Sequence, residues 1–426
     1  DDEAALAAAR AADRARAAGS RAPLLGLPLT VKDSLATAGL RTASGSLARA
    51  GHVPVRDATA VARLRAAGAV VVAKTAVPEY TWAYETESAL HGRTRNPHDL
   101  ERTCGGSSGG EAALLGADAS LAGIGTDGGG SIRLPSHYCG VAGHRPTVGL
   151  VPETGCWPAT RATGLLDVNA VGPMARHVED LALLLPVLAG PDDADPFVHG
   201  LELGDPGAVE VERLRVALCA GGAELHAGEA TRSTLRAAGR ALAERGCELS
   251  EPTFPAVAEA TELFFALMAA DGGAAARADL AAAGGRHAEA FALLLEKLRP
   301  LATDAAGLLG LLERQASLRS RVRRFLRRFD AALLPVAPGP APLPGRVPGE
   351  ELGLEGFAAF TGLQALSLAG VPVTVARAGW DGPLPLGVQV VAPPGRDHVC
   401  LAVAAALEEA LGPFAGVPAA LAAELG

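Results

Sequence analysis

Lysine is scarce in this 426-residue chain. Only three of its 38 basic residues are lysines, at positions 32, 74 and 297, and the others are arginines. Arginine stays charged at physiological pH, whereas a buried lysine can lose its proton and act as a base. In a chain that uses arginine wherever any cation is sufficient, each remaining lysine is a candidate for chemistry that a guanidinium cannot perform.

Other features are missing, and each absence excludes a class of function. No apolar run approaches the roughly 18 residues of a membrane-spanning helix, and the net charge of −9 disfavours nucleic acid and anionic membranes as partners. The chain has no His-Glu-x-x-His, no Gly-Lys-Ser/Thr and no Cys-x-x-Cys motif, so we expect neither a metal site nor a bound cofactor. The six scattered cysteines predict reduced thiols and a cytoplasmic location.

Glycine and serine, by contrast, are concentrated between Thr103 and Pro146. This stretch contains Gly-Gly-Ser-Ser-Gly-Gly at 105–110 and Gly-Gly-Gly-Ser at 128–131. Glycines permit positive φ angles and close approach of the backbone to a ligand. A serine hydroxyl beside unpaired backbone N–H groups supplies what acyl transfer requires, namely a nucleophile and donors for the developing oxyanion.

Three simpler interpretations compete for this stretch. Gly105 to Gly109 fits the Gly-x-Ser-x-Gly nucleophile elbow, but the ten preceding residues are polar and contain a proline, where the elbow needs a hydrophobic strand. Gly123 to Gly128 fits the Gly-x-Gly-x-x-Gly dinucleotide motif, yet the first acid after Asp127 is Glu153, in a turn-like segment. In the third interpretation the glycines form turns without chemistry; all three remain open at this point.

A longer pattern favours another interpretation. The sequences GGSSGG and GTDGGGSIRLPS, with Val-Lys-Asp upstream, together resemble the amidase signature family of serine hydrolases. The likeness extends from Leu27 to Arg176 and resumes more faintly from about Asp330. The resemblance implies that Ser131 is the nucleophile, that Ser107, after a cis peptide, relays its proton, and that Lys32 is the base. The spacings of 75 residues from Lys32 to Ser107 and 24 to Ser131 are typical of the family.

The resemblance also implies supporting roles around these three residues. The backbone amides of Gly128, Gly129, Gly130 and Ser131 would form the oxyanion hole. Ser108, Thr126, Asp127 and Arg133 match positions that brace the loop in the family.

Aromatic residues make up only 4% of the chain, yet several gather in one short segment. Tyr80, Trp82 and Tyr84 fall within five residues, and Trp157 lies in a loop region further on. We expect these four side chains to line a substrate pocket, although packing in the core would account for them equally well.

The order of predicted elements indicates an α/β fold. Apolar runs at 24–31 and 69–72 predict strands on either side of a helix, and a second β–α–β pattern covers 213–249. The resemblance implies a large mixed, mostly parallel central sheet covered by helices on both faces. We expect a single domain over 1–426, with a catalytic core at 20–190, a helix-rich region at 205–330, and strands and a helix at 331–426 that complete the core.

The leading functional hypothesis is hydrolysis of a small-molecule carboxamide through an acyl-enzyme. The first alternative is the glutaminase subunit of a tRNA-dependent amidotransferase, which shares the fold and triad but requires a partner. The second is a dinucleotide-binding protein that uses Gly123–Gly128. The expected partner is a small-molecule amide, and a homodimer is left open.

Overall fold

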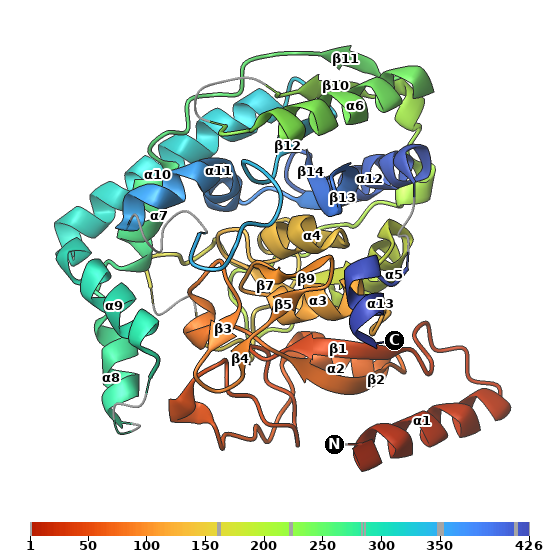
Figure 1. The fold of residues 1–426 in the computed structure, drawn as a ribbon, viewed down its shortest axis with the longest axis vertical. Coiled ribbons are helices and arrows are strands. Elements are labelled where there is room, and N and C mark those ends of the chain that lie inside the picture. Colours follow the sequence, from red (N-terminus) through yellow and green to blue (C-terminus); the bar gives the residue numbers. More distant parts are fainter. Residues whose placement is uncertain are drawn as a thin grey trace.

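The computed structural model describes residues 2–159, 163–220, 225–282, 284, 287–346, 353–412 and 416–425. Within these residues the fold is centred on a ten-stranded mixed sheet of order β11-β10-β12-β14-β13-β8-β9-β7-β1-β2 (Figure 1). The strands are β1 (Pro28–Lys32), β2 (Val70–Thr75), β7 (Ala122–Asp127), β8 (Ala142–Arg145), β9 (Ala170–Ala175), β10 (Arg215–Leu218), β11 (Glu248–Ser250), β12 (Ala331–Pro335), β13 (Val373–Asp381) and β14 (Leu384–Val391). Pairing is parallel at both ends of the sheet and antiparallel in the middle. The expected large mixed sheet is confirmed.

Helices cover both faces of the sheet, because successive residues of a strand point to opposite sides. In β12, Leu333 packs into one hydrophobic core, whereas Ala332 and Leu334 pack into another on the opposite face. The first face carries α2 (Thr59–Ala66), α5 (Val178–Leu188), α6 (Glu229–Arg245) and α12 (Asp397–Leu411). The second carries α3 (Gly109–Gly116), α4 (Arg133–Cys139), α7 (Ala260–Met268), α10 (Ala305–Leu326) and α11 (Thr361–Ala369).

The remaining elements lie at the periphery (Figure 1). They are the helices α1 (Asp2–Ala17), α8 (Ala274–Ala282), α9 (Glu289–Leu298) and α13 (Ala419–Leu425), and the short strand pairs β3 (Glu87–Ser88) with β4 (Gly92–Arg93) and β5 (Arg95–Asn96) with β6 (Asp99–Thr103). Over the described part of the chain, no helix combines the length and apolarity needed to cross a membrane.

The carboxyl ends of β1 and β7 bring the sequence motifs together. These strands are parallel neighbours in the sheet, with Val31 opposite Ile124. Because parallel strands end at the same edge, Lys32 at the end of β1 and Asp127 at the end of β7 lie on the same side. The second glycine cluster follows β7 directly, so the serine that ends it returns to this edge.

Candidate active site

Lys32 is fully buried, and its amine faces oxygen atoms from two other segments. Its Nζ atom donates to the Oγ atom of Ser107 at 2.8 Å, and to Oγ1 and the carbonyl oxygen of Thr126 at 2.8 and 3.1 Å. Burial penalises the charged ammonium and lowers the pKa of Lys32 to about 7, although the charge of Asp127 opposes the shift. A large fraction of this amine is therefore uncharged near neutral pH, as a general base must be.

Ser107 connects this amine to the second serine-bearing loop. The Gly106–Ser107 peptide is cis, as the family resemblance implies. Ser107 and Ser131 line the same cavity, and the N–H of Ser108 donates to the carbonyl oxygen of Ser131 at 3.0 Å, which ties the two loops together. The hydroxyl of Ser108 donates to the carbonyl oxygen of Thr126 at 3.3 Å, so it is engaged with the backbone.

Asp127 holds the second loop from inside. Its buried carboxylate accepts from the backbone N–H groups of Gly130, Ile132 and Arg133 at 2.8, 3.1 and 3.2 Å, and from Nε and Nη2 of Arg133 at 2.9 Å each. Burial alone would raise the pKa of Asp127, but the charge and hydrogen bonds of Arg133, with further help from Arg145, lower it well below its usual range. The carboxylate is thus a permanent anion that closes the loop at both ends.

The same bonds revise the expected oxyanion hole. The N–H of Gly130 points to Oδ1 of Asp127 and is occupied there, so Gly130 is a poorer candidate donor than the resemblance implies. Its role is conformational, because its φ of +133° lies in a region that favours glycine. The amides of Gly128, Gly129 and Ser131 are left as the candidate donors toward the cavity.

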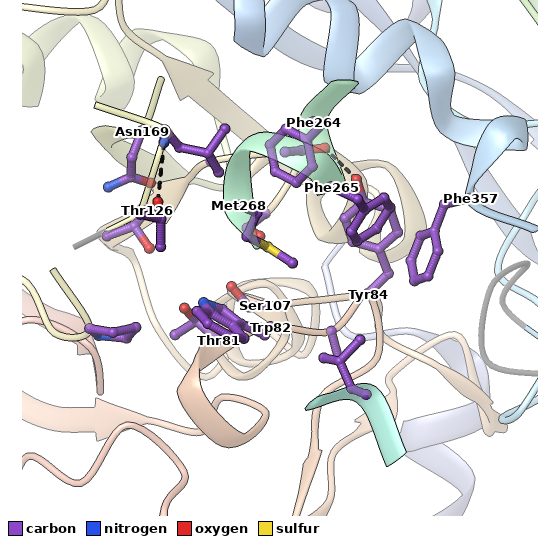
Figure 2. A pocket seen from close by; sticks show the side chains of 18 of the residues that line it. Thr81, Trp82, Tyr84, Ser107, Thr126, Asn169, Phe264, Phe265, Met268 and Phe357 are labelled. Atoms are coloured by element: carbon purple, nitrogen blue, oxygen red, sulfur yellow. Dashed lines mark hydrogen bonds between the residues drawn. The ribbon is translucent and has the colours of Figure 1, made fainter. Parts of the chain in front are cut away.

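The cavity beside the two serines is small and apolar. Its volume is about 90 Å³, somewhat less than the ~150 Å³ of an apolar cavity that holds benzene. Figure 2 shows the rings of Phe264, Phe265 and Phe357 gathered at one end, with Ser107 nearer the middle. The largest lining side chains are Trp82, Tyr84, Phe264, Phe265, Met268 and Phe357, and no charged side chain lines it among the described residues.

The four aromatic residues expected in the pocket divide into two pairs. Trp82 and Tyr84 line the cavity. Tyr80 and Trp157 do not: Tyr80 is 1% exposed and packs against Trp157 and Phe291, with ring centroids 4.6 and 4.7 Å apart. The prediction that these two line the pocket is wrong, because side chains at i and i+2 of an irregular segment need not share a side.

The structure also contradicts the dinucleotide interpretation of Gly123–Gly128. Gly123 and Gly125 lie inside β7 and not in a turn that opens a helix. A Cβ atom on Gly123 would overlap the Glu111 carboxylate, and one on Gly125 would lie 2.8 Å from Oγ of Ser108. These glycines therefore allow α3 to pack closely on the strand.

Sequence reasoning missed the wall formed by α7. Phe264 and Met268 are four residues apart on this helix and so face the same way, and Phe265 lies beside them. The adjacent phenylalanines at 264–265 were a signal in a chain with only ten phenylalanines, but in an Ala/Leu-rich helix they are also typical of ordinary core.

Comparison with known proteins agrees with this geometry. The Amidase family model matches residues 1–401. The chain belongs to the amidase signature family. Its sequence is similar to the amidase-type subunit of glutamyl-tRNA(Gln) amidotransferase from Thermus thermophilus, with 34% identity over 425 residues, which cover 94% of this chain and 88% of the relative.

Solved amidase structures share the fold over almost the whole chain. One belongs to a complex described as vestigial and as revealing the origins of an s-triazine catabolic enzyme; it is 30% identical, with a TM-score of 0.85, over 97% of this chain and 90% of that one. Another is 6-aminohexanoate cyclic dimer hydrolase complexed with substrate, 26% identical with a TM-score of 0.84, over 98% and 95%. The protein is therefore an amidohydrolase-type enzyme of this fold.

Proposed function

We propose that this amidase hydrolyses small uncharged carboxamides that carry a short alkyl or phenyl-sized acyl group. The observation that supports the substrate class is the cavity beside Ser107 and Ser131, which has apolar walls and no charged lining residue in the described chain. A charged group placed there without a partner would lose its hydration and gain nothing in exchange. The volume of about 90 Å³ further favours acyl groups no larger than benzene.

The proposed reaction uses Ser131 as nucleophile, Ser107 as relay and Lys32 as base. Neutral Lys32 takes the proton of Ser107 as Ser107 takes that of Ser131, and the Oγ atom of Ser131 forms a bond to the carbonyl carbon. The carbonyl oxygen becomes an oxyanion, which backbone amides of the second glycine cluster stabilise. The C–N bond then breaks, and the leaving nitrogen receives the proton that Lys32 holds.

Water completes the cycle. It attacks the acyl-enzyme, passes one proton to the same relay and releases the carboxylic acid, while Ser131 recovers its proton. All proton transfers use groups of the chain, and the shifted pKa of Lys32, about 7, lets this amine accept and return a proton near neutral pH.

A second candidate is the glutaminase function within a tRNA-dependent amidotransferase. The names of the sequence relatives favour it: glutamyl-tRNA(Gln) amidotransferase subunits from Thermus thermophilus, Roseiflexus and Synechococcus are 33–34% identical over more than nine-tenths of this chain. Glutamine, however, carries an ammonium and a carboxylate, and each would need a partner in the cavity. The apolar lining is the observation that places this candidate second.

Turnover by the purified chain distinguishes the two candidates. Hexanamide, benzamide and L-glutamine are incubated with the chain, with Ser131→Ala as the blank, and ammonia release is measured. The proposal expects release from hexanamide or benzamide and none from glutamine. Release from glutamine alone would favour the amidotransferase function, and no release from any amide would contradict the proposed hydrolysis of small carboxamides.

A further inference from the structure

We propose that Tyr84 and Gln364 form a hydrogen-bonded brace that fixes the Gly129–Gly130 peptide, and thereby sets the direction of the amides that bind the oxyanion. Both are positioning residues, since they act through the loop and not on the reacting atoms. The inference rests on the proposed function and adds a role for two residues outside the triad and its motifs.

The Gly129–Gly130 peptide is gripped at both of its polar ends. The hydroxyl of Tyr84 donates to the carbonyl oxygen of Gly129 at 2.5 Å. On the other side of the same peptide plane, the N–H of Gly130 donates to Oδ1 of Asp127 at 2.8 Å. A peptide is planar, so two bonds at opposite ends fix its rotation. The neighbouring amides of Gly129 and Ser131 take their direction from that plane.

A chain of buried polar groups supports the Tyr84 hydroxyl. Nε2 of Gln364 donates to this hydroxyl at 3.3 Å, and Oε1 of Gln364 accepts from Oγ1 of Thr261 at 2.5 Å. Thr261 also lies 2.8 Å from the Thr361 hydroxyl. Burial raises the pKa of Tyr84 far above neutrality, so the phenol keeps its proton and remains a donor.

Helix α11 supplies both sides of this grip. Gln364 holds Tyr84, while the carbonyl oxygen of Leu363 and the hydroxyl of Ser367 accept from Arg133 at 3.0 and 2.6 Å, and Arg133 in turn holds Asp127. The two ends of one peptide are thus referred to a single rigid element. Preorganised donors of this kind need no reorientation as negative charge develops.

The three tyrosines of the chain provide matched variants for a test. Tyr84→Phe removes the brace but keeps the ring in the cavity. Tyr138→Phe removes a buried hydroxyl from the same hydrophobic cluster, and Tyr80→Phe removes a buried hydroxyl that has no hydrogen-bond partner among the described residues. The wild type and the three variants are treated with a short-chain alkyl fluorophosphonate, in which Ser131 bonds to phosphorus as fluoride leaves and its proton passes through Ser107 to Lys32.

We expect Tyr84→Phe to label about tenfold to a hundredfold more slowly than the wild type, and the other two variants at the wild-type rate. A paired binding measurement separates orientation from packing. Affinity for 1,1,1-trifluoroheptan-2-one, which forms a tetrahedral adduct with serine, should fall in Tyr84→Phe by a similar factor. Affinity for heptan-2-one, which only fills the cavity, should stay the same.

The outcomes separate the two hypotheses. A wild-type protein that resists labelling overturns the proposed function, because Ser131 is then not activated. Labelling of Tyr84→Phe at the wild-type rate, or an equal loss of affinity for both ketones, overturns the brace. If Tyr84→Phe does not fold, Gln364→Met, which removes only the support of the hydroxyl, decides: the brace requires slower labelling by several-fold with unchanged affinity for heptan-2-one, and an unchanged rate overturns it.

Discussion

The Nζ atom of Lys32 lies 2.8 Å from the Oγ atom of Ser107, although 75 residues separate them in the chain. The contact exists because Lys32 ends β1, whose parallel neighbour β7 ends beside the loop that carries Ser107. A buried amine next to a hydroxyl is the arrangement from which the mechanistic predictions follow.

The first prediction concerns the serines. Ser131→Ala should lower kcat by about 10⁴-fold or more, because no other hydroxyl is expected to form the acyl-enzyme. Ser108→Ala is the matched control: its hydroxyl donates to the backbone oxygen of Thr126, so turnover should stay within a few-fold of wild type. Steady-state hydrolysis of hexanamide measures both, and full activity in Ser131→Ala would refute the assignment of the nucleophile.

The second prediction is a pH dependence. The uncharged form of Lys32 is the base, and its pKa is lowered to about 7 by burial. The value of kcat/KM should therefore rise with pH through about 7 and level off above it. Lys32→Arg should give a low rate with no rise in this range, since a guanidinium does not lose its proton. A wild-type profile that falls from pH 6 to pH 8 would contradict the proposed base.

The third prediction concerns stability. The pKa of Lys32 is lower in the folded than in the unfolded chain, so between about 7 and 10 the unfolded state binds more protons and the free energy of unfolding rises with pH. Lys32→Met removes this contribution. The difference in unfolding free energy between wild type and Lys32→Met should thus move in favour of the wild type as pH rises from 7 to 9, by at most about 1.4 kcal/mol per pH unit. Urea titrations at several pH values would test it, and a pH-independent difference would contradict the shift.

The fourth prediction concerns the buried ion pair. Arg133→Met leaves the Asp127 carboxylate buried without its cation, which should cost about 3–5 kcal/mol of unfolding free energy. Arg213→Met is the comparison, because Arg213 and its partner Glu210 have side chains 75% and 60% exposed and their pairing is screened by water. Equal stability of the two variants would show that the Asp127 pair does not hold the loop.

The fifth prediction uses two adjacent glycines. A Cβ atom on Gly129 would lie 2.8 Å from Cζ of Phe264, a ring already packed edge-to-face against Phe265, so Gly129→Ala should lower kcat/KM by about tenfold or more. Within the described residues, a Cβ atom on Gly128 would meet nothing closer than Oδ1 of Asn169 at 3.6 Å. Gly128→Ala should remain active, and an equal loss in both variants would show that the loop backbone, and not the ring, is the constraint.

Local sequence carried much of the catalytic geometry. The glycine–serine clusters indicated two loops with exposed hydroxyls, and the scarcity of lysine drew attention to Lys32, which the structure places beside Ser107. The strands at 28–32 and 70–75 were recognisable from short apolar runs. These features depend on residues close together in the chain, where periodicity and turn chemistry are informative.

The pocket and its supports were less predictable, because they depend on packing between distant segments. Tyr80 and Tyr84 are four residues apart, yet one stacks against Phe291 and the other reaches Gly129. Nothing near Gln364 in the sequence signals that it meets Tyr84, 280 residues earlier. A buried glutamine in a helix is a hint of a polar contact, but its partner is known only once the fold is known.

The dependence of Arg133 on α11 and β14 also limits how the chain can be divided. A fragment that stops after α5 retains all three residues of the Lys–Ser–Ser set but loses the acceptors that Leu363, Ser367 and Gln389 offer to the guanidinium. Such a half-protein would carry every reactive group and still lack the scaffold that aims them, so catalysis here belongs to the whole sheet and not to its motif-bearing portion.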